Sequence, residues 1–329
     1  MPSLRDLKKR LQSVKTTGQL AGAMRTVSTA KYSRASSSLK GNAPYSAALN
    51  ELASVAGGSG AASLGSLKKH GRQGKKKRRE EGFKEEYKER VVLVLISGNR
   101  GLCGGYNHEL FNFFSEKYRR FDAPLVVACG RMAAEYCREK HIPLHAELSI
   151  KDVPSHEDAD ALYELVFKAY TDGGRVIFCF QRFINMLKQS PVLTRFLPPD
   201  AEQTEDEKAL GLIPFASVIG GADEKDAAEE NDEVQLREPD GRGHIQNLLF
   251  IPDRETVLRK LLPLCLKNGV YTLLLQCASG AQAATLMAMR AAYDNAASSA
   301  QQLETAINRR RQALVTQSVI ETAAESEQY

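Results

Sequence analysis

The C-terminal end of the chain constrains its fold most, because it can form only one very long helix. From Ser279 onward the sequence is alanine-rich and contains no proline, and after Gly280 it contains no glycine. In one helix, about 45 residues make a rod of roughly 65–70 Å. Its apolar positions follow the alternating three- and four-residue steps of a left-handed coiled coil: Leu286, Met289, Tyr293, Ala296, Ala300, Leu303 and Ile307. No ordinary globular core needs such a helix, so we expect a shaft paired with a second helix.

The seam changes character after Ile307. Its next positions are Arg310, Leu314, Gln317 and Glu321. We therefore expect the partner helix to end near Ile307, and the final stretch to continue without it.

A matching helix is predicted at the N-terminus. Its apolar stripe advances by three and four residues: Leu4, Leu7, Leu11, Val14, Gly18 and Ala21. A slightly shifted stripe then continues the apolar face: Leu20, Met24 and Val27. We predict one helix over residues 4–42, bent or interrupted near Pro44 and resumed to about residue 54.

The two terminal helices are expected to pair antiparallel. With Leu4 level with Ile307, large residues face small ones in the pairs Leu11 with Ala300, Val14 with Ala296, and Gly18 with Tyr293. Close packing favours such size complementarity. This register is therefore our prediction.

Between the shaft helices, strand and helix patterns alternate. The apolar run VVLVLIS at residue 91 predicts a buried strand, and it leads into the glycine-rich GNRGLCGGYN. Further strands are predicted over 124–129, 175–183 and 247–251, and helices over 107–120, 131–140, 159–170 and, strained at Pro263, 256–267. Residues 210–219 are expected to pair only briefly. The fold class is therefore α/β: a long antiparallel coiled coil of the terminal helices plus an open, largely parallel α/β sheet domain.

Charge is strongly segregated along the chain. The formal net charge is +5, but residues 68–90 carry 11 basic and 5 acidic side chains, whereas 200–240 carry 3 basic and 14 acidic ones. Neither segment can bury an apolar face. We divide the chain into an N-terminal shaft helix (1–56), a basic flexible insertion (57–90), an α/β domain (91–278, with the acidic insertion 200–240) and a C-terminal shaft helix (279–329).

No motif indicates bond chemistry. The glycine-rich segment could cradle a phosphate, but it lacks the GK[ST] of a P-loop and a suitably placed acidic residue for a ribose, so we interpret it as a tight structural turn. The six cysteines form no CxxC pair and the six histidines no HExxH motif. We expect no catalytic residue, cofactor or metal site, and cysteines that are reduced and mostly small core residues.

The sequence also predicts no direct membrane insertion. Every apolar run falls short of the roughly 20 residues of a spanning helix, and the N-terminus lacks the apolar core of a signal peptide. Any membrane role would therefore come through partners.

Three segments in order carry a family resemblance: MPSLRDLKKRLQSVKTTGQLAGAMRTVSTAKYSRA, ISGNRGLCGGYN and NRRRQALVTQSVIE. They resemble the N-terminal shaft helix, the first-strand signature and the C-terminal helix motif of the γ subunits of F-type ATP synthases. Weaker support comes from FCFQRFINMLKQSPVLTRFLP, LLFIPDRETVLRKLLP and the MAM at residues 287–289. The match spans nearly the whole chain apart from the two charged insertions.

The sequence departs from the family pattern at four positions. Asn99 replaces the usual Asp, Gly280 and Ala281 replace Glu and His, and Ser318 replaces Glu. These changes affect individual polar contacts rather than the shaft. The acidic insertion contains no cysteine, so the redox switch of the chloroplast branch is not expected, and the absence of a transit peptide favours a bacterial source.

The resemblance implies a mechanical subunit that performs no bond chemistry. It would turn inside a ring of three α and three β subunits, driven by the proton- or sodium-conducting c-ring, with its α/β domain meeting the ε subunit and that ring. It would be a peripheral protein on the cytoplasmic face of the bacterial cell membrane. By motif matching, Arg311 and Gln312 would engage a loop of β, and Met24 would lie near an acidic segment of β.

Two other functions remain open at this stage. The basic segments are compatible with a coiled-coil scaffold or nucleic-acid-binding protein, although the aromatic residues that stack on bases are scarce there, and we expect no nucleic acid. A dinucleotide-binding enzyme is the third candidate.

Overall fold

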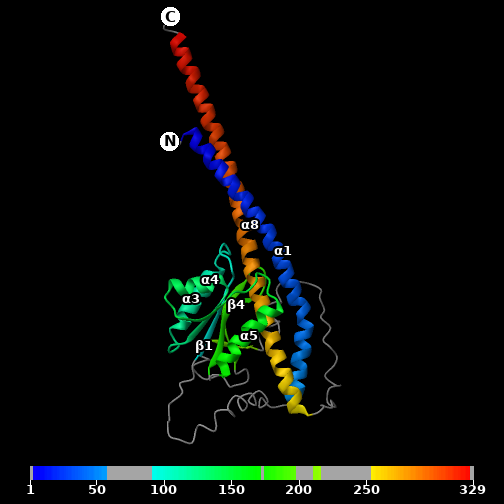
Figure 1. Ribbon diagram of the computed structural model, residues 1–329. Helices are drawn as coiled ribbons and strands as arrows, with labels where there is room; N and C mark the ends of the chain where they lie inside the picture. Colours follow the sequence, from blue (N-terminus) through cyan, green and yellow to red (C-terminus); the bar gives the residue numbers. More distant parts are fainter. Residues whose placement is uncertain (1–2, 58–90, 172–173, 198–209, 216–252, 327–329) are drawn as a thin grey trace. The chain divides into compact units, whose positions relative to one another are not determined.

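The computed structural model describes residues 3–57, 91–171, 174–197, 210–215 and 253–326. They divide into two compact units. The smaller unit comprises Met1–Ala30, Leu102–Gly104 and Gln282–Tyr329, and the larger comprises Lys31–Gly101 and Gly105–Ala281. Two long helices, α1 (Leu4–Gly57) and α8 (Arg254–Ser326), contribute residues to both units (Figure 1).

A six-stranded sheet forms the centre of the larger unit. Its strands are β1 (Val91–Ile96), β2 (Leu125–Cys129), β3 (Leu144–Leu148), β4 (Arg175–Phe183), β5 (Gln189–Leu197) and β6 (Leu212–Pro214). Their order across the sheet is β3-β2-β1-β4-β5-β6. Strands β1 to β4 run parallel, β5 is antiparallel to β4, and β6 is parallel to β5. The apolar run of β1 is buried because helices cover both faces of the sheet.

Alternate residues of β1 point to opposite faces of the sheet. Leu93 and Leu95 pack with α3 (Tyr106–Tyr118) and α4 (Arg131–Glu139) on one face (Figure 1). On the other face, the remaining buried residues of β1 pack with α5 (His156–Thr171) and with α8. The part of α8 in this unit is therefore a core helix.

Burial explains the apolar character of α8. The stretch Thr256–Ile320 is long and apolar enough to cross a membrane by length and composition, which the search for apolar runs did not anticipate. Most of its apolar window is buried inside the protein. Its composition is therefore accounted for by packing within the protein.

The end of α1 is capped by the beginning of α8. The guanidinium of Arg254 donates hydrogen bonds to the carbonyl oxygens of Val55 (2.6 Å) and Ala56 (2.5 Å). These carbonyls belong to the last turn of α1, where a helix lacks its own donors. The contact joins the two helices at one end of the pair.

Most sequence-predicted elements of the α/β domain are confirmed. Strands β1, β2 and β4 and helices α3, α4 and α5 lie within a few residues of their expected bounds. The brief pairing expected near residue 210 is β6. The strand predicted over 247–251, the basic insertion after its first residue, Gly57, and most of the acidic insertion lie outside the described residues; Gly57 itself is the last residue of α1.

Other expectations were wrong. The predicted interruption near Pro44 is absent, because helix α1 runs on through Pro44, which is exposed while Asn42 and Ser46 on either side are buried against α8. The predicted helix over 256–267 is part of α8, which continues through Pro263. Strands β3 and β5 were missed, because β3 is half-exposed and short and β5 begins with polar residues and Pro191.

Gly130 generates the first prediction. Its φ is +91°, and a Cβ there would collide with the carbonyl oxygen of Ser97. Replacing Gly130 with Ala should lower the free energy of unfolding by about 2–4 kcal/mol, through backbone strain and the clash. Urea unfolding of the purified chain measures this.

The matched control is Gly41→Ala. Gly41 lies in α1 with no atom within 4 Å of a built Cβ, so the change should stabilise the chain by about 0.5–1 kcal/mol. Equal effects of the two substitutions would contradict the assigned turn geometry.

Candidate functional site

The glycine-rich segment after β1 packs closely against neighbouring elements. A Cβ on Gly98 would lie 3.5 Å from the Cβ of Ala281, and one on Gly280 would lie 3.3 Å from Cε2 of Tyr106. The hydroxyl of Tyr106 donates to the carbonyl oxygen of Cys277 (3.1 Å). Small residues at 98, 280 and 281 therefore let α8 approach the carboxyl end of β1, which supports the structural interpretation of the glycines.

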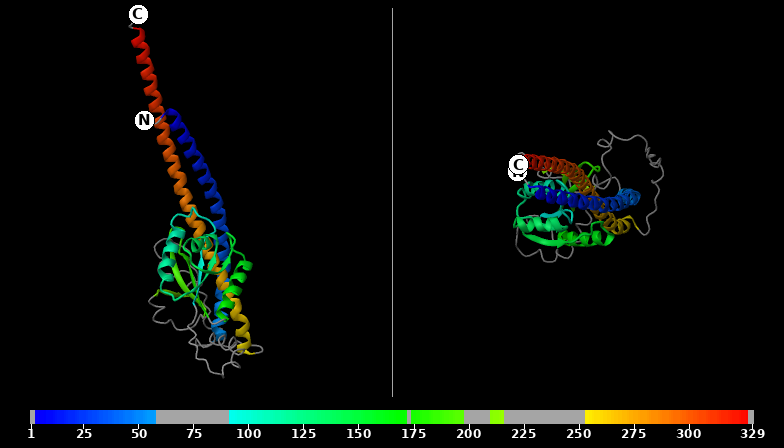
Figure 2. Two further views of the ribbon diagram at one scale, coloured as in Figure 1. Left: turned by 60° about the vertical axis from the view of Figure 1, so that its left-hand side comes forward. Right: turned by 90° about the horizontal axis from the view of Figure 1, so that it is seen from above.

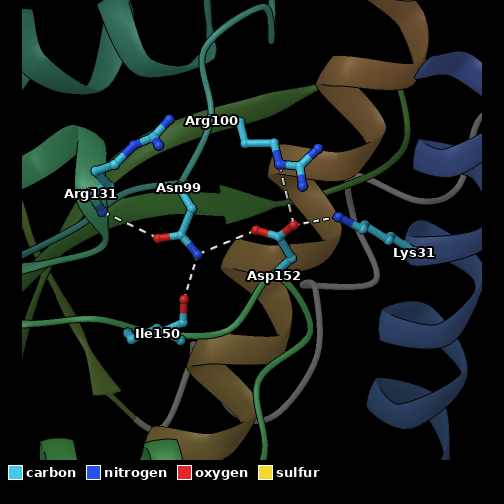
Figure 3. A network of polar contacts seen from close by, with 6 residues as sticks. All are labelled: Lys31, Asn99, Arg100, Arg131, Ile150 and Asp152. Atoms are coloured by element: carbon cyan, nitrogen blue, oxygen red, sulfur yellow. Dashed lines mark hydrogen bonds and ion pairs between the residues drawn. The ribbon is translucent and has the colours of Figure 1, made fainter.

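Asn99 organises a polar network in the larger unit (Figure 3). Its Oδ1 accepts a hydrogen bond from the backbone N–H of Arg131 (3.2 Å), and its Nδ2 donates to Oδ1 of Asp152 (3.3 Å) and to the carbonyl oxygen of Ile150. Lys31 of α1 donates to Oδ2 of Asp152. The network thus joins α1 to the loops that follow β1 and β3.

The amide of Asn99 matters because it can donate a hydrogen bond. An Asp at this position, the residue usual in the family, would place a second carboxylate against Asp152 and could not donate to it when ionised. An Asn at position 99 is therefore compatible with the carboxylate of Asp152, to which it donates a hydrogen bond.

Asp152 is held as a carboxylate. Burial alone would raise its pKa, but hydrogen bonds from Lys31 and Asn99 and the charges of Lys31 and Arg100 outweigh burial, so its pKa lies below the usual value. Nε of Arg100 lies 3.5 Å from Oδ2. With the carboxylate 22% exposed, the pair with Lys31 is partly shielded from solvent.

In the smaller unit, α1 and α8 pair through small residues. A Cβ on Gly18 would lie 3.2 Å from that of Ala296, and one on Gly22 would lie 3.4 Å from the ring of Tyr293. The guanidinium of Arg25 lies 5.0 Å from the centre of the Tyr293 ring. The absence of side chains at 18 and 22 thus lets the helices approach closely.

The predicted register was wrong by about one helical turn. Gly18 faces Ala296, where size complementarity had placed Val14, and Gly22 faces Tyr293, where it had placed Gly18. The pairing remains antiparallel (Figures 1 and 2). Small residues recur along both helices, so complementary sizes do not select one register.

The proposed seam residues differ in burial. Gly18 is buried, whereas Tyr293 is 40% exposed. The other seam residues are half-buried: Leu4, Leu11, Val14, Ala296, Ala300 and Ile307. The shifted stripe was wrong at two positions, since Leu20 is 61% and Val27 49% exposed. The buried face instead continues through Ala21 and Ser28.

The proposed partner-contact residues lie on unpaired helix surface or beside it. Met24 is half-buried, whereas Arg311 and Gln312 are exposed on α8. Within the smaller unit, α8 extends past the N-terminus of α1 (Figure 2). Residues 311–320 are all exposed. The change of seam character after Ile307 had predicted this unpaired end.

Sequence reasoning missed an apolar surface on that end of α8. The exposed side chains are Leu314, Val315, Val319 and Ile320, between 42% and 62% exposed. Their spacing of about one turn was visible in the sequence, but only the position of the N-terminal end of α1 shows that no other helix among the described residues of the smaller unit covers them.

No metal-binding cluster of His, Cys, Asp or Glu occurs among the described residues. All six cysteines are free thiols, five of them buried. Burial raises the pKa of Cys137 to about 11 and that of Cys129 to about 12. These thiols therefore pack as small apolar residues, as the sequence predicted.

The Asp152 network predicts a pH-dependent stability. Because the folded pKa lies below the unfolded value of about 3.9, the carboxylate stabilises the fold above that pH, and the contribution is lost as the pH falls through the folded pKa. Asp152→Asn should therefore cost about 1 kcal/mol at pH 7 and progressively less below pH ~4. Urea unfolding across this range measures the difference, and a cost independent of pH would argue against the ion pair.

Comparisons with known proteins cover almost the whole chain. A family model described as ATP synthase matches residues 3–326. The ATP synthase gamma chain of a Picosynechococcus species is 30% identical over 98% of this chain and 98% of its own length. That of Rubrobacter xylanophilus is 28% identical over 99% of this chain and 98% of its own.

Solved structures share the fold. In a Euglena gracilis mitochondrial ATP synthase, a rotor chain matches with a TM-score of 0.51 at 15% identity, over 95% of this chain and 98% of that one. A chain from the OSCP/F1/c-ring structure of the same enzyme matches with a TM-score of 0.56 at 14% identity, over 98% and 92%. Together with the sequence matches, these likenesses support one conclusion: the chain belongs to the ATP synthase gamma chain family.

Proposed function

We propose that this chain is the central-stalk rotor subunit of an F1Fo ATP synthase, coupling ion-driven rotation to ATP synthesis or hydrolysis in the α/β ring. The family match over residues 3–326 supports the rotor over the scaffold and dinucleotide-enzyme alternatives. The structural observation that carries the proposal is the end of α8, which continues as a helix beyond α1 with its apolar side chains exposed.

An exposed apolar helix end is expected where a partner protein surrounds the helix. Four large apolar side chains, Leu314, Val315, Val319 and Ile320, lie within two turns of each other on a part of α8 that no other described residue of the smaller unit buries. Contiguous exposed apolar surface marks interaction sites. The ring of three α and three β subunits is the partner whose interior would enclose this end.

Torque transmission requires a stiff shaft. Close approach at Gly18 and Gly22 packs the backbones of α1 and α8 together. The ammonium of Lys15 lies 2.7 Å from a carboxylate oxygen of Glu304 across the pair, although an exposed ion pair contributes little. Coiled-coil packing therefore supplies most of the resistance to bending.

The subunit is non-catalytic, and the chemistry of ATP lies in the β subunits. Rotation of an asymmetric shaft would move the β sites through binding, synthesis and release. The α/β domain would meet the ε subunit and the c-ring.

Two contacts with β are proposed. Arg311 and Gln312 are exposed on the unpaired part of α8, and a guanidinium forms directional hydrogen bonds with carboxylate or carbonyl oxygens. Met24, on α1, would lie near an acidic segment of β. The exposure of residues 311 and 312 supports the first contact. Met24 is half-buried, so only part of its side chain is accessible to a partner.

The complex is membrane-bound. We propose that this subunit lies at the cytoplasmic face of a bacterial cell membrane, because the two gamma chains described above come from bacteria. Such a position requires no membrane-spanning segment in this chain.

The double substitution Arg311→Ala and Gln312→Ala tests the contact with β. ATP-driven proton pumping in membrane vesicles should fall several-fold, because a charge-assisted contact typically contributes ~1.5–3 kcal/mol, while assembly with α and β persists. Gln302→Ala, at an exposed position on α8 beside α1, is the control and should leave pumping unchanged. Unaltered pumping in the double variant would remove residues 311 and 312 from the coupling contact.

A further inference from the structure

Four polar side chains form a buried layer between α1 and α8 in the larger unit. Asn42 and Ser46 come from α1, Asn268 and Thr272 come from α8, and none is more than 9% exposed. Nδ2 of Asn42 donates to Oγ1 of Thr272 (2.9 Å), and Nδ2 of Asn268 donates to Oγ of Ser46 (2.7 Å). Nδ2 of Asn42 also approaches Oγ of Ser46 (3.2 Å), which links all four side chains.

Stability does not explain this layer. In the part of the chain that the structure describes, Oδ1 of Asn268 is buried and accepts no hydrogen bond. An unsatisfied buried acceptor costs free energy. Replacing both partners of a buried hydrogen bond with apolar groups of the same shape can be nearly neutral or stabilising, so an apolar seam is expected to hold these helices about as tightly.

The layer instead distinguishes one register from its neighbours. On α1, Leu49 is seven residues beyond Asn42; on α8, Cys265 is seven residues before Thr272, and its Sγ lies 3.7 Å from the carbonyl oxygen of Leu49. The two helices therefore keep one register over this segment. The hydrogen bonds from α1 to α8 form only in that register.

A slip of one turn would break the layer. In the register that size complementarity had predicted, Thr272 would face Leu39 and Ser46 would face Cys265. The Asn42 amide would then lose the Thr272 hydroxyl, and a polar group would lie against an apolar one at a cost. Size complementarity in the smaller unit had favoured that register, so apolar packing does not by itself select the observed one.

We propose that the Asn42, Ser46, Asn268 and Thr272 layer is a register lock, which fixes the axial position of α1 against α8 where apolar packing would tolerate a slip of one turn. Buried polar residues set register in coiled coils in the same way. The lock concerns the folding of this chain and holds whether or not the chain is a rotor.

The native Cys265 provides a reporter of register. With Leu49→Cys, a disulfide to Cys265 reports the observed register, because the two positions already face each other. With Leu49→Cys and Leu262→Cys in a chain that also carries Cys265→Ser, a disulfide between residues 49 and 262 reports the slipped register, because that slip of one turn brings position 262 opposite position 49. Each crosslink is made in the full-length chain under mild oxidation and identified by peptide mass spectrometry.

The test is to remove the polar layer and to measure the crosslink that reports the slipped register, called the slipped crosslink below. The variant carries Asn42→Leu, Ser46→Ala, Asn268→Leu and Thr272→Val. We expect its urea midpoint to stay the same or rise, while the crosslink between residues 49 and 262 increases about tenfold, as when a buried hydrogen bond no longer discriminates between registers. A crosslink between residues 49 and 262 that stays at the background of the otherwise native chain would overturn the proposal.

Two further variants keep the test decisive. Thr272→Val alone removes one hydroxyl at constant volume and should also raise the slipped crosslink; if the fourfold variant fails to fold and this one leaves the crosslink at background, the lock is refuted. Leu39→Ala weakens the seam next to the layer and should lower the urea midpoint without raising the slipped crosslink. A slipped crosslink in Leu39→Ala equal to that in Thr272→Val would assign register to apolar packing instead.

Discussion

The antiparallel packing of α1 against α8 is the interaction on which the rest of the structure depends. In the larger unit, α8 is at once the partner of α1 and a core helix of the sheet, since its apolar residues belong to the same cluster as alternate residues of β1. In the smaller unit, glycines at 18 and 22 let the two backbones approach Ala296 and Tyr293. One helix therefore needs different surfaces along its length, and its composition changes accordingly from leucine-rich to alanine-rich.

Polar contacts add specificity that apolar packing lacks. Arg254 caps the last carbonyls of α1, and Lys31 joins α1 to Asp152 beside the sheet. Asn99 supports that carboxylate with a neutral amide where the family usually has an acid. Each contact fixes α1 at a different point along the larger unit, so residues 31–57 of α1 and the sheet are expected to move together.

Periodic patterns in the sequence predicted the helices and most strands, but they did not predict features that fit several positions along the same pattern. Periodic spacing identified both long helices and the end of pairing near Ile307, and the apolar runs identified β1, β2 and β4. Periodicity did not fix the register, because small residues recur every turn and one turn of slip preserves the pattern. Proline also misled, because tertiary packing on both sides of Pro44 and Pro263 outweighs one lost hydrogen bond in each helix. The Asp152 network joins residues far apart in the sequence, so no local pattern indicated it. Residues 311 and 312 were found only through the family resemblance.

The central claim is that this chain turns inside a ring of α and β subunits, and single-molecule rotation tests it most directly. Leu187, which is 78% exposed at the β4–β5 turn, is replaced by Cys to attach a bead to the chain assembled with its α and β partners fixed to a surface. The account predicts that ATP drives one-way rotation of the bead in steps set by the three β subunits. ATP hydrolysis by the same surface-bound complexes with a bead that only fluctuates about one angle would contradict it.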